Sequence, residues 1–280
     1  MATITVETFA VQEIPVLRMA EAGQEGQPVV FFVHGFTGNK RSALMLGYEL
    51  AEAGFTTVSF DAPMHGDRYH PHLGAMLDGE GDYVYPVGTG LDVFFMLHEI
   101  IMQAAEDIET LIGYLDAEGR TDTGRIGLTG FSMGGFTTFY AAANNPRIQA
   151  AAPIAGIPSF ADRWRDVVLE SSSYEAWADA MAAAEPETRE RTAFMEWIDP
   201  FDGLARFVPK PLMILCGDKD LDAPKIYSVD LYRALKPCYA DHPERLRLTI
   251  HDEAGHEMTA AMRQDVRAWF TRYLLDTART

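Results

Sequence analysis

Gly130-Phe131-Ser132-Met133-Gly134 is the stretch that decides the fold of this chain, together with the segments on either side of it. The apolar residues before it, 125–129, predict a buried strand, and the small residues after it, 135–143, predict a helix. A serine in a tight strand-to-helix turn has a strained backbone and stands exposed at the sheet edge, where a substrate carbonyl can reach it. The neighbouring glycines give this turn room for close packing. We therefore predict that Ser132 is a catalytic nucleophile and not a residue of an ordinary turn.

Segments typical of strands and of helices alternate along most of the chain. The run Pro28-Val29-Val30-Phe31-Phe32-Val33 is continuously apolar, as expected of a strand buried on both faces. Apolar residues alternate over 4–17, which predicts an antiparallel pair at a sheet edge. Because strands and helices alternate after that point, we expect an α/β fold whose mostly parallel sheet is flanked by helices. The further strands that we expect lie at 55–60, 125–129, 150–157, 212–216 and 246–250, with long helices at 43–53 and 91–115.

Two segments interrupt this alternation, although we expect residues 1–280 to form a single domain. One is Met64–Gly90, to which the sequence assigns no role, and the other is Ser159–Val208, which is helical in composition and rich in aromatic residues. Insertions of this length in a compact domain are usually functional lids. We therefore predict that residues 159–208 form a helical cap over the active site, and the alternative is a helical layer that buries only its own apolar face. Its candidate substrate-binding residues are Trp164, Trp177 and Trp197.

The overall charge limits the partners of this protein. Its formal net charge is −18, so its field repels nucleic-acid phosphates and anionic membranes. We expect a small-molecule substrate, and neither nucleic acid nor a membrane as a partner. The N-terminus has no signal-peptide pattern, and the two cysteines, Cys216 and Cys238, suit a reducing compartment, so we expect a cytoplasmic protein. The sequence does not determine the oligomeric state.

A serine hydroxyl needs a base, and that base needs an orienting carboxylate. We predict that His256 is the base, because it lies in a loop between the last strand and the last helix. The acid is expected in the loop after the strand at 212–216, where three aspartates stand close together. Asp220 is our choice, Asp222 is the alternative, and Asp218 is more typical of a turn residue. The order serine, acid, histidine along the chain is the one found in hydrolases whose nucleophile lies at a turn from a strand to a helix.

A serine that attacks a carbonyl group also needs two backbone N–H groups that bind the developing oxyanion. We predict that Met133 supplies one, because it follows the serine. Phe36 is expected to supply the other from the loop that begins with His34 and Gly35 after a buried strand. We expect His34 and Gly35 to contact the substrate as well.

Several other chemistries are not supported by the motifs. The chain contains no G-x-G-x-x-G, no phosphate-binding loop of correct spacing and no H-E-x-x-H. The group His65, Asp67, His70 and His72 has irregular spacing, so we favour polar loop contacts over a metal site there. We therefore expect neither a metal nor a cofactor.

Taken together, these residues resemble the α/β-hydrolase family over nearly the whole chain. Phe32-Val33-His34-Gly35-Phe36-Thr37-Gly38 and Asp61-Ala62-Pro63-Met64-His65-Gly66-Asp67-Arg68 are similar to bacterial short-chain carboxylesterases of the branch related to dienelactone hydrolases and prolyl oligopeptidases. The resemblance implies that 61–66 shape the floor of the pocket. The chain differs from dienelactone hydrolases, whose nucleophile is cysteine, and we expect no propeller domain, which weakens a peptidase interpretation.

We therefore expect a serine carboxylesterase that hydrolyses small esters through Ser132, His256 and Asp220. An aminopeptidase-like or thioester hydrolase of the same fold is the alternative enzyme. A non-catalytic binding protein with this fold is the alternative from another functional class, although no triad residue is missing. The sequence leaves the natural ester and its acyl chain length open.

Overall fold

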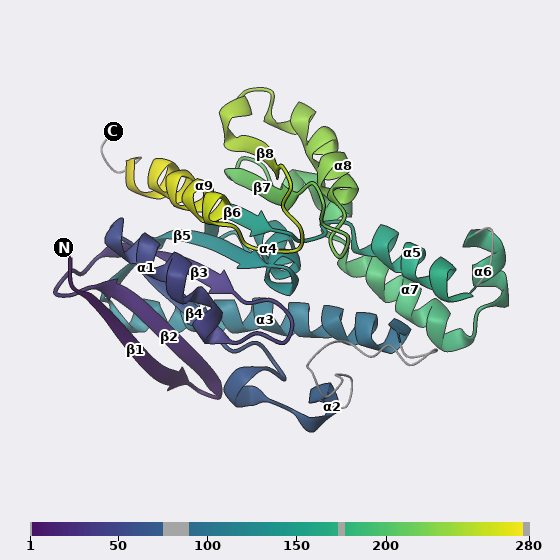
Figure 1. Ribbon diagram of the computed structural model, residues 1–280, viewed down its shortest axis with the longest axis horizontal. Coiled ribbons are helices and arrows are strands. Elements are labelled where there is room, and N and C mark those ends of the chain that lie inside the picture. The colour runs from purple at the N-terminus through teal and green to yellow at the C-terminus, as the bar shows by residue number, and fades with distance from the viewer. Residues whose placement is uncertain (1, 75–89, 173–176, 277–280) are drawn as a thin grey trace.

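The computed structural model of the protein describes residues 2–74, 90–172 and 177–276. Within these residues one eight-stranded sheet forms the centre of the molecule, in the order β1-β2-β4-β3-β5-β6-β7-β8 (Figure 1). The first two strands pair in antiparallel fashion, β2 pairs with β4 in the same way, and from β4 to β8 all neighbours are parallel. The strands are β1 (Ile4–Val11), β2 (Ile14–Glu21), β3 (Gln27–Val33), β4 (Thr56–Phe60), β5 (Thr121–Phe131), β6 (Ile148–Ile154), β7 (Leu212–Gly217) and β8 (Leu246–His251).

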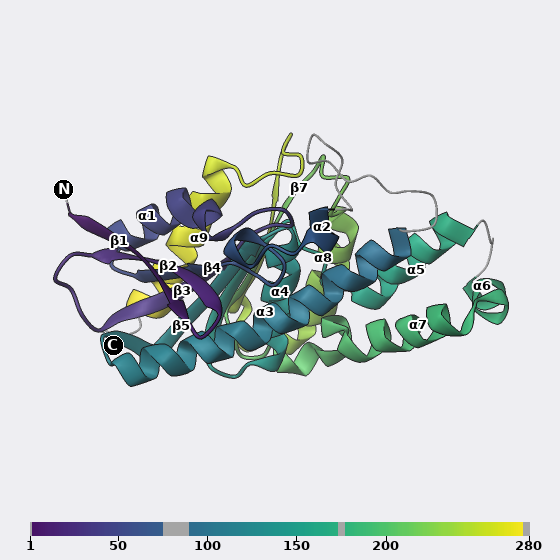
Figure 2. The same ribbon diagram turned by 90° about the horizontal axis from the view of Figure 1, so that it is seen from below.

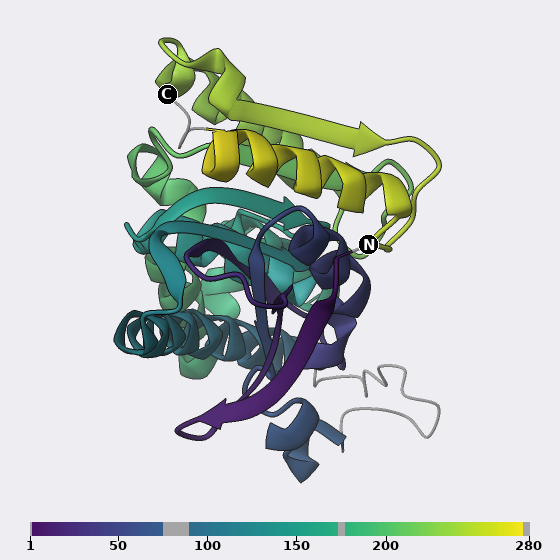
Figure 3. The ribbon, with the colours of Figure 1, turned by 90° about the vertical axis from the view of Figure 1, so that its left-hand side faces the viewer.

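Helices cover both faces of this sheet. Successive side chains of a strand point to opposite faces, and β3 shows the result. Val30 and Phe32 pack in the core beneath α1 and α9, whereas Phe31 and Val33 pack in the core beneath α3 and α4. Figure 3 shows α9 lying along one face of the sheet. The covering helices are α1 (Leu44–Glu52), α3 (Gly90–Glu118), α4 (Met133–Asn144), α8 (Lys225–Leu235) and α9 (Ala260–Phe270).

The segment between β6 and β7 is helical, as its composition predicts. Its helices extend beyond the sheet, and α5 and α7 run beside the N-terminal half of α3 (Figure 2). The Asp199 carboxylate accepts hydrogen bonds from Ala161 N (2.9 Å) and Phe201 N (2.8 Å), so one side chain joins the entrance of the segment to its exit. Burial raises the pKa of Asp199 to about 6. The elements here are α5 (Phe160–Ser172), α6 (Trp177–Ala183), α7 (Pro186–Ile198) and η3 (Pro200–Arg206).

This architecture confirms the mostly parallel sheet flanked by helices that the alternating pattern predicts. The edge pair β1–β2 is antiparallel, and the long helix α3 extends to Glu118, beyond the expected end at residue 115. Of the first insertion the structure describes η2 (Gly66–Arg68) and α2 (Pro71–Gly74), while residues 75–89 lie outside the described part. No helix in the described ranges has the length and apolar character that a membrane span requires.

Candidate active site

Ser132 occupies the turn between β5 and α4 with a backbone conformation that few side chains adopt. Its φ of 54° and ψ of −117° lie outside the favoured regions for L-residues. The turn fits because its flanking glycines have no side chain. A Cβ on Gly134 would lie 1.9 Å from the Val33 carbonyl oxygen, and one on Gly130 would lie 2.4 Å from the Gly134 carbonyl oxygen. Close packing of β3, β5 and α4 therefore fixes the position of the serine.

A continuous chain of hydrogen bonds links Ser132 to His256 and Asp220. The Ser132 Oγ lies 2.8 Å from His256 Nε2. On the other side of the ring, Nδ1 lies 2.9 Å from Asp220 Oδ2 and 3.0 Å from Oδ1. Since a carboxylate only accepts hydrogen bonds, Nδ1 carries a proton, and Nε2 of the neutral ring accepts the proton of the serine hydroxyl. The geometry is that of a nucleophile beside an oriented base.

The backbone of its own loop holds Asp220 in place. This loop follows β7, and the Asp220 Oδ1 accepts hydrogen bonds from Asp222 N (3.0 Å) and Ala223 N (2.8 Å). The Asp220 side chain is fully buried beneath His256, whereas the Asp222 residue is exposed. Of the aspartates considered from the sequence, Asp220 is therefore the one that the structure brings to the histidine.

The residues considered for the oxyanion hole border the same cavity as the serine. Phe36 and Met133 line it together with Ser132, and so does Gly35, which the sequence suggests as a substrate contact. A Cβ on Gly35 would lie only 3.5 Å from the Ser132 Cβ, which shows how close the loop after β3 approaches. Met133 is the first residue of α4, where the positive end of the helix dipole favours negative charge. The backbone at this corner of the cavity suits an oxyanion.

His34 anchors this loop and does not line the cavity. Its Nδ1–H donates to the Gly35 carbonyl (2.7 Å), and its Nε2 accepts from Ala62 N (3.1 Å) in the loop after β4. Burial lowers the pKa of His34 to about 4, so the ring is neutral at pH 7. The completely buried ring positions the loop, so direct contact between His34 and substrate, as expected from the sequence, finds no support in this placement.

A buried ion pair also holds the loop after β3 in place. Lys40 Nζ lies 2.6 Å from Asp61 Oδ2 and 2.7 Å from Asp67 Oδ2. The Asp61 carboxylate also accepts hydrogen bonds from Lys40 N (2.7 Å) and Asp67 N (2.8 Å). Burial by itself raises the pKa of Asp61, but these partners outweigh it and the net shift is downward. Gly66 is required here, because with φ at 56° a Cβ would lie 2.2 Å from the Asp61 Cγ.

The cavity in front of Ser132 has a volume of about 340 Å³ and is largely apolar. Its walls come from α3, α4, α5 and the loops after β3, β7 and β8. Sequence reasoning missed wall residues on α3, α4 and α5, because their exposure to the cavity depends on tertiary packing. The available signal was a cationic residue within the aromatic-rich insertion of an acidic chain. The wall residues missed in this way are Phe94, Leu97, Phe136 and Arg163.

Two of the three tryptophans considered as substrate contacts, Trp164 and Trp197, have other surroundings. Trp164 is fully buried, and its ring N–H donates to Thr192 Oγ1 (2.8 Å) on α7. Trp197 is 74% exposed. Trp177 begins α6, but its side chain lies outside the described part of the structure. Neither Trp164 nor Trp197 lines the cavity, so the expectation that they contact substrate finds no support.

Potential metal ligands gather only at the serine site within the described residues. The group is Asp220, Asp222 and His256, and the hydrogen bonds given above already occupy two of its members. In the other group considered, His65 Nδ1 donates to the Pro63 carbonyl (2.8 Å) and Asp67 binds Lys40. The side chain of His72 is outside the described part.

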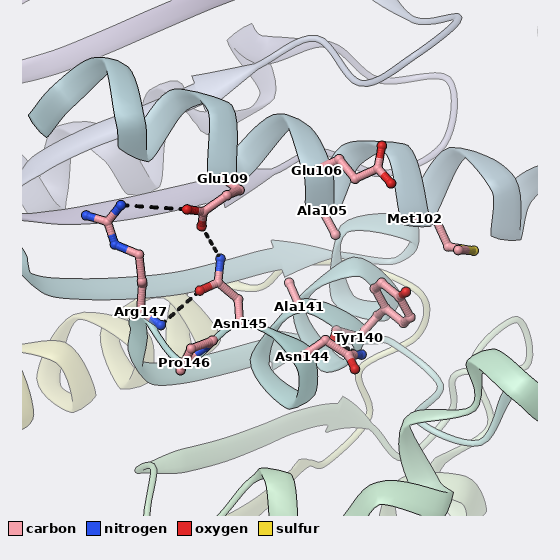
Figure 4. Close-up of a pocket in the computed structure, with 10 residues that line it drawn as sticks. All are labelled: Met102, Ala105, Glu106, Glu109, Tyr140, Ala141, Asn144, Asn145, Pro146 and Arg147. Carbon is pink, nitrogen blue, oxygen red and sulfur yellow. Dashed lines mark hydrogen bonds and ion pairs between the residues drawn. The ribbon is translucent and has the colours of Figure 1, made fainter. Parts of the chain in front are cut away.

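A second hollow of about 420 Å³ lies between α3 and the end of α4 (Figure 4). Its wall carries an ion pair between Arg147 and Glu109 (3.7 Å) and a hydrogen bond from Asn145 Nδ2 to Glu109 (2.8 Å). No serine, cysteine or histidine is among the described residues that line it. Of these two cavities, only the one at Ser132 therefore offers a nucleophile.

Two family models match this chain over more than half of its length. The model of the prolyl oligopeptidase family matches residues 102–277, and that of the dienelactone hydrolase family matches residues 16–172. The two matches overlap, and together they include the loop after β3, the serine turn, Asp220 and His256.

Curated relatives and solved structures agree with these matches. "Putative esterase YitV" of Bacillus subtilis is 29% identical, over 97% of this chain and 100% of the relative. Esterase YjfP of Escherichia coli is 27% identical, over 83% of this chain and 85% of the relative. The crystal structure of TT1662 from Thermus thermophilus superposes with a TM-score of 0.71 at 20% identity, covering 98% of this chain and 99% of the other. The structural likeness supports the fold, and the sequence relatives are named as esterases.

Proposed function

Because this chain belongs to the prolyl oligopeptidase and dienelactone hydrolase families and has a serine at the turn after β5, we propose that this serine hydrolase with the α/β-hydrolase fold is a carboxylesterase of small esters with Ser132 as nucleophile. The observation that carries the proposal is the hydrogen-bond chain from Ser132 Oγ through His256 to the buried Asp220 carboxylate. The names of the relatives YitV and YjfP favour ester substrates over peptides.

In the proposed mechanism, His256 Nε2 takes the hydroxyl proton while the Ser132 oxygen attacks the ester carbonyl carbon. Asp220 stabilises the imidazolium that forms and keeps the correct nitrogen toward the serine. The N–H groups of Phe36 and Met133 donate to the oxyanion of the tetrahedral intermediate. His256 then returns its proton to the leaving alcohol, which departs and leaves an acyl group on Ser132. Water, deprotonated by His256, releases the carboxylic acid and restores the serine.

The surroundings of the serine support this assignment. Ser132 stands at the strained turn typical of such nucleophiles, and the positive end of α4 faces the site of the developing charge. The neutral His34 ring and the Lys40–Asp61 pair fix the loop that carries Phe36 before substrate arrives. A donor fixed in advance does not have to be reoriented during the reaction, which is how oxyanion holes lower barriers.

A fluorophosphonate probe and a panel of esters test the proposal. The wild-type protein should be labelled and should hydrolyse short-chain esters, and Ser132→Ala should abolish both. His256→Ala should remove nearly all turnover, and the double variant should be little worse than either single variant, because triad members act as a unit. Multiplicative losses in the double variant would contradict the triad, provided that circular dichroism shows each variant folded.

The same panel separates the alternatives. Aminoacyl anilides and acyl thioesters, compared with oxygen esters of equal acyl chain, identify a peptidase-like or thioester-cleaving enzyme by the ratio of their kcat/KM values. A protein that is neither labelled nor active on any of them would be a binding protein of this fold. The range of chain lengths in the ester series would then define the acyl preference of the active enzyme.

A further inference from the structure

One wall of the largely apolar cavity carries a cationic side chain. Arg163 lies on the first turns of α5 and lines the cavity together with Ser132 and His256. It is half-buried, and no ion pair joins it to a carboxylate among the residues that the structure describes. A guanidinium that faces a substrate cavity without a counter-ion is costly to desolvate, so a charged wall is unexpected for a purely apolar substrate.

The hydrogen bonds around Arg163 fix its position but leave its charge unneutralised. Its described partner is the hydroxyl of Tyr227 on α8. That hydroxyl donates its proton to Asp166 Oδ2, so its oxygen is free to accept from the guanidinium. Burial and the neighbouring Asp166 raise the pKa of Tyr227 to about 12, so the phenol keeps its proton at neutral pH. Tyr227 therefore bridges Arg163 and Asp166, two residues of α5 between which the described part of the chain shows no direct ion pair.

The other charges of the cavity do not replace a counter-ion. Asp222 lines the cavity too, but it is exposed on the loop after β7, and Asp220, which is not among the lining residues, is committed to His256. The molecule as a whole carries a formal charge of −18, which repels anions. An anionic substrate group would therefore need a local cation, and arginine suits a carboxylate because its planar N–H groups bind both oxygens at once.

We propose that Arg163 binds a carboxylate carried by the ester substrate itself, at a distance of a few bonds from the ester carbonyl. The substrate class is then the half-ester, and Arg163 determines specificity. This inference rests on the proposed esterase function of Ser132. The carboxylate lies either on the acyl part, as in a monoester of a dicarboxylic acid, or on the alcohol part, as in an ester of a hydroxy acid. Both sources present the same group to the guanidinium.

Matched pairs of anionic and neutral esters test this proposal. For the acyl side the pair is monoethyl glutarate and ethyl hexanoate, and for the alcohol side it is 3-(butanoyloxy)propanoate and butyl butanoate. In Arg163→Gln the kcat/KM for one of the two anionic esters should fall by roughly 10–100-fold, the range for losing charge-assisted hydrogen bonds. The two neutral esters should change by less than about threefold. Arg165→Gln, an exposed change on the same helix, is the control for lost net charge.

Two further variants keep the test informative if Arg163→Gln folds poorly. Arg163→Lys keeps the charge but loses the bidentate geometry, so it should give an intermediate loss on the same anionic ester. Tyr227→Phe should free Asp166 to pair with Arg163 and so weaken the same substrate without affecting the neutral ester. The anionic ester that loses activity identifies the side on which the carboxylate lies.

The outcomes separate this inference from the proposed function. If neutral esters are hydrolysed in a Ser132-dependent way, but Arg163→Gln affects anionic and neutral members equally, the carboxylate site is wrong and the esterase assignment stands. The same holds if the wild-type enzyme hydrolyses neither anionic ester. If no ester is hydrolysed by any variant, isothermal titration calorimetry with glutarate and the Ser132→Ala protein tests carboxylate binding at Arg163 independently of esterase activity. Arg163-dependent binding would then support the site, and its absence would overturn it.

Discussion

Asp220 and Asp222 lie two residues apart in one loop, and their surroundings differ completely. The Asp220 carboxylate is buried against the His256 ring and accepts two backbone N–H groups from its own loop. Asp222 is exposed and contributes its backbone N–H to Asp220. A carboxylate in the first position stabilises an imidazolium, whereas one in the second position remains solvated.

Replacing each aspartate by asparagine tests this difference. Asp220→Asn should lower turnover by up to roughly 10⁴-fold, because an amide favours the wrong histidine tautomer and does not stabilise the charged ring. Asp222→Asn and Asp218→Asn should each cost less than about tenfold, since neither removes the partner of His256. Steady-state kinetics on one neutral ester, with Tm as the folding control, give the comparison. If Asp222→Asn is the more damaging change, Asp222 is the acid and the loop rearranges in solution.

At the residue scale, the sequence predicts the candidate catalytic residues best where the spacing of residues along the chain defines a motif. The serine turn is predictable because a serine between two glycines, at the end of a buried strand and before a helix, is typical of a nucleophile. His256 and an acid in the loop at 218–222 are predictable because they follow it in the expected chain order, but that order does not choose between Asp220 and Asp222. Arg163 was not predictable in this way. Its place on the cavity wall depends on how α5 packs beside α3 and α8, and no local spacing encodes that packing.

At the scale of elements, the helices between β6 and β7 are held together by their own aromatic core. The ring of Trp164 on α5 is completely buried and bonds Thr192 on α7, while Phe94 of α3 stacks on it at a centroid distance of 6.0 Å. Trp197 near the end of α7 is mostly exposed. Two tryptophans of the same helical segment therefore have opposite roles in packing.

Alanine at these two positions should affect stability very differently. Trp164→Ala removes a fully buried ring and leaves the Thr192 hydroxyl without this partner, so we expect a loss of about 3–5 kcal/mol in the free energy of unfolding. Trp197→Ala should change it by less than about 0.5 kcal/mol, as surface substitutions usually do. Urea denaturation and limited proteolysis of residues 159–208 measure both effects. Equal stability of the two variants, with a changed substrate ranking in Trp164→Ala, would restore the substrate-contact role considered from the sequence.

The aromatic content of this segment predicted helices but not the direction in which they face. Apolar strands such as β3 are predictable because a strand buried on both faces is continuously apolar. An amphipathic helix leaves a choice, since the same apolar stripe can face a substrate cavity or a neighbouring helix. In α5 the indole of Trp164 turns toward α3 and α7, and the adjacent Arg163 turns to the cavity. Whether the segment also closes over the site remains a proposal.

At the scale of the whole molecule, buried histidines couple folding to pH. Burial lowers the pKa of both His34 and His98 to about 4, and His98 is completely enclosed, with its Nδ1–H donating to the Phe94 carbonyl (2.8 Å). Burial also lowers the pKa of His65. The unfolded chain binds protons at these rings below about pH 6.5, whereas the folded protein keeps the His34 and His98 rings neutral until about pH 4. Their contribution to stability is therefore present above pH 6.5 and is lost as the pH falls toward 4.

Asp199 acts in the opposite direction, and the balance can be worked out. Its pKa is raised to about 6, so the folded protein holds a proton near pH 5 that the unfolded carboxylate has already released. That contribution to stability is present at low pH and is lost as the pH rises through 6. Two or three histidines outweigh one aspartate, so the unfolded state binds more protons overall between pH 4 and 6. We therefore expect the free energy of unfolding to increase with pH across this window.

Urea denaturation at intervals between pH 4.5 and 7 measures this slope, which reaches about 1.4 kcal/mol per pH unit for each additional proton that the unfolded state binds, and which should level off near pH 7. His98→Asn should reduce the slope by up to the same amount, because the variant has no ring that protonates on unfolding. Its absolute stability will also fall, since the ring packs among Phe94, Phe136 and Phe160, but the slope is independent of that loss. His242→Asn, at a site more than half exposed, is the matched control. A slope that is unchanged in His98→Asn would mean that the ring takes up its proton in the folded protein, and the buried neutral histidine would then be wrong.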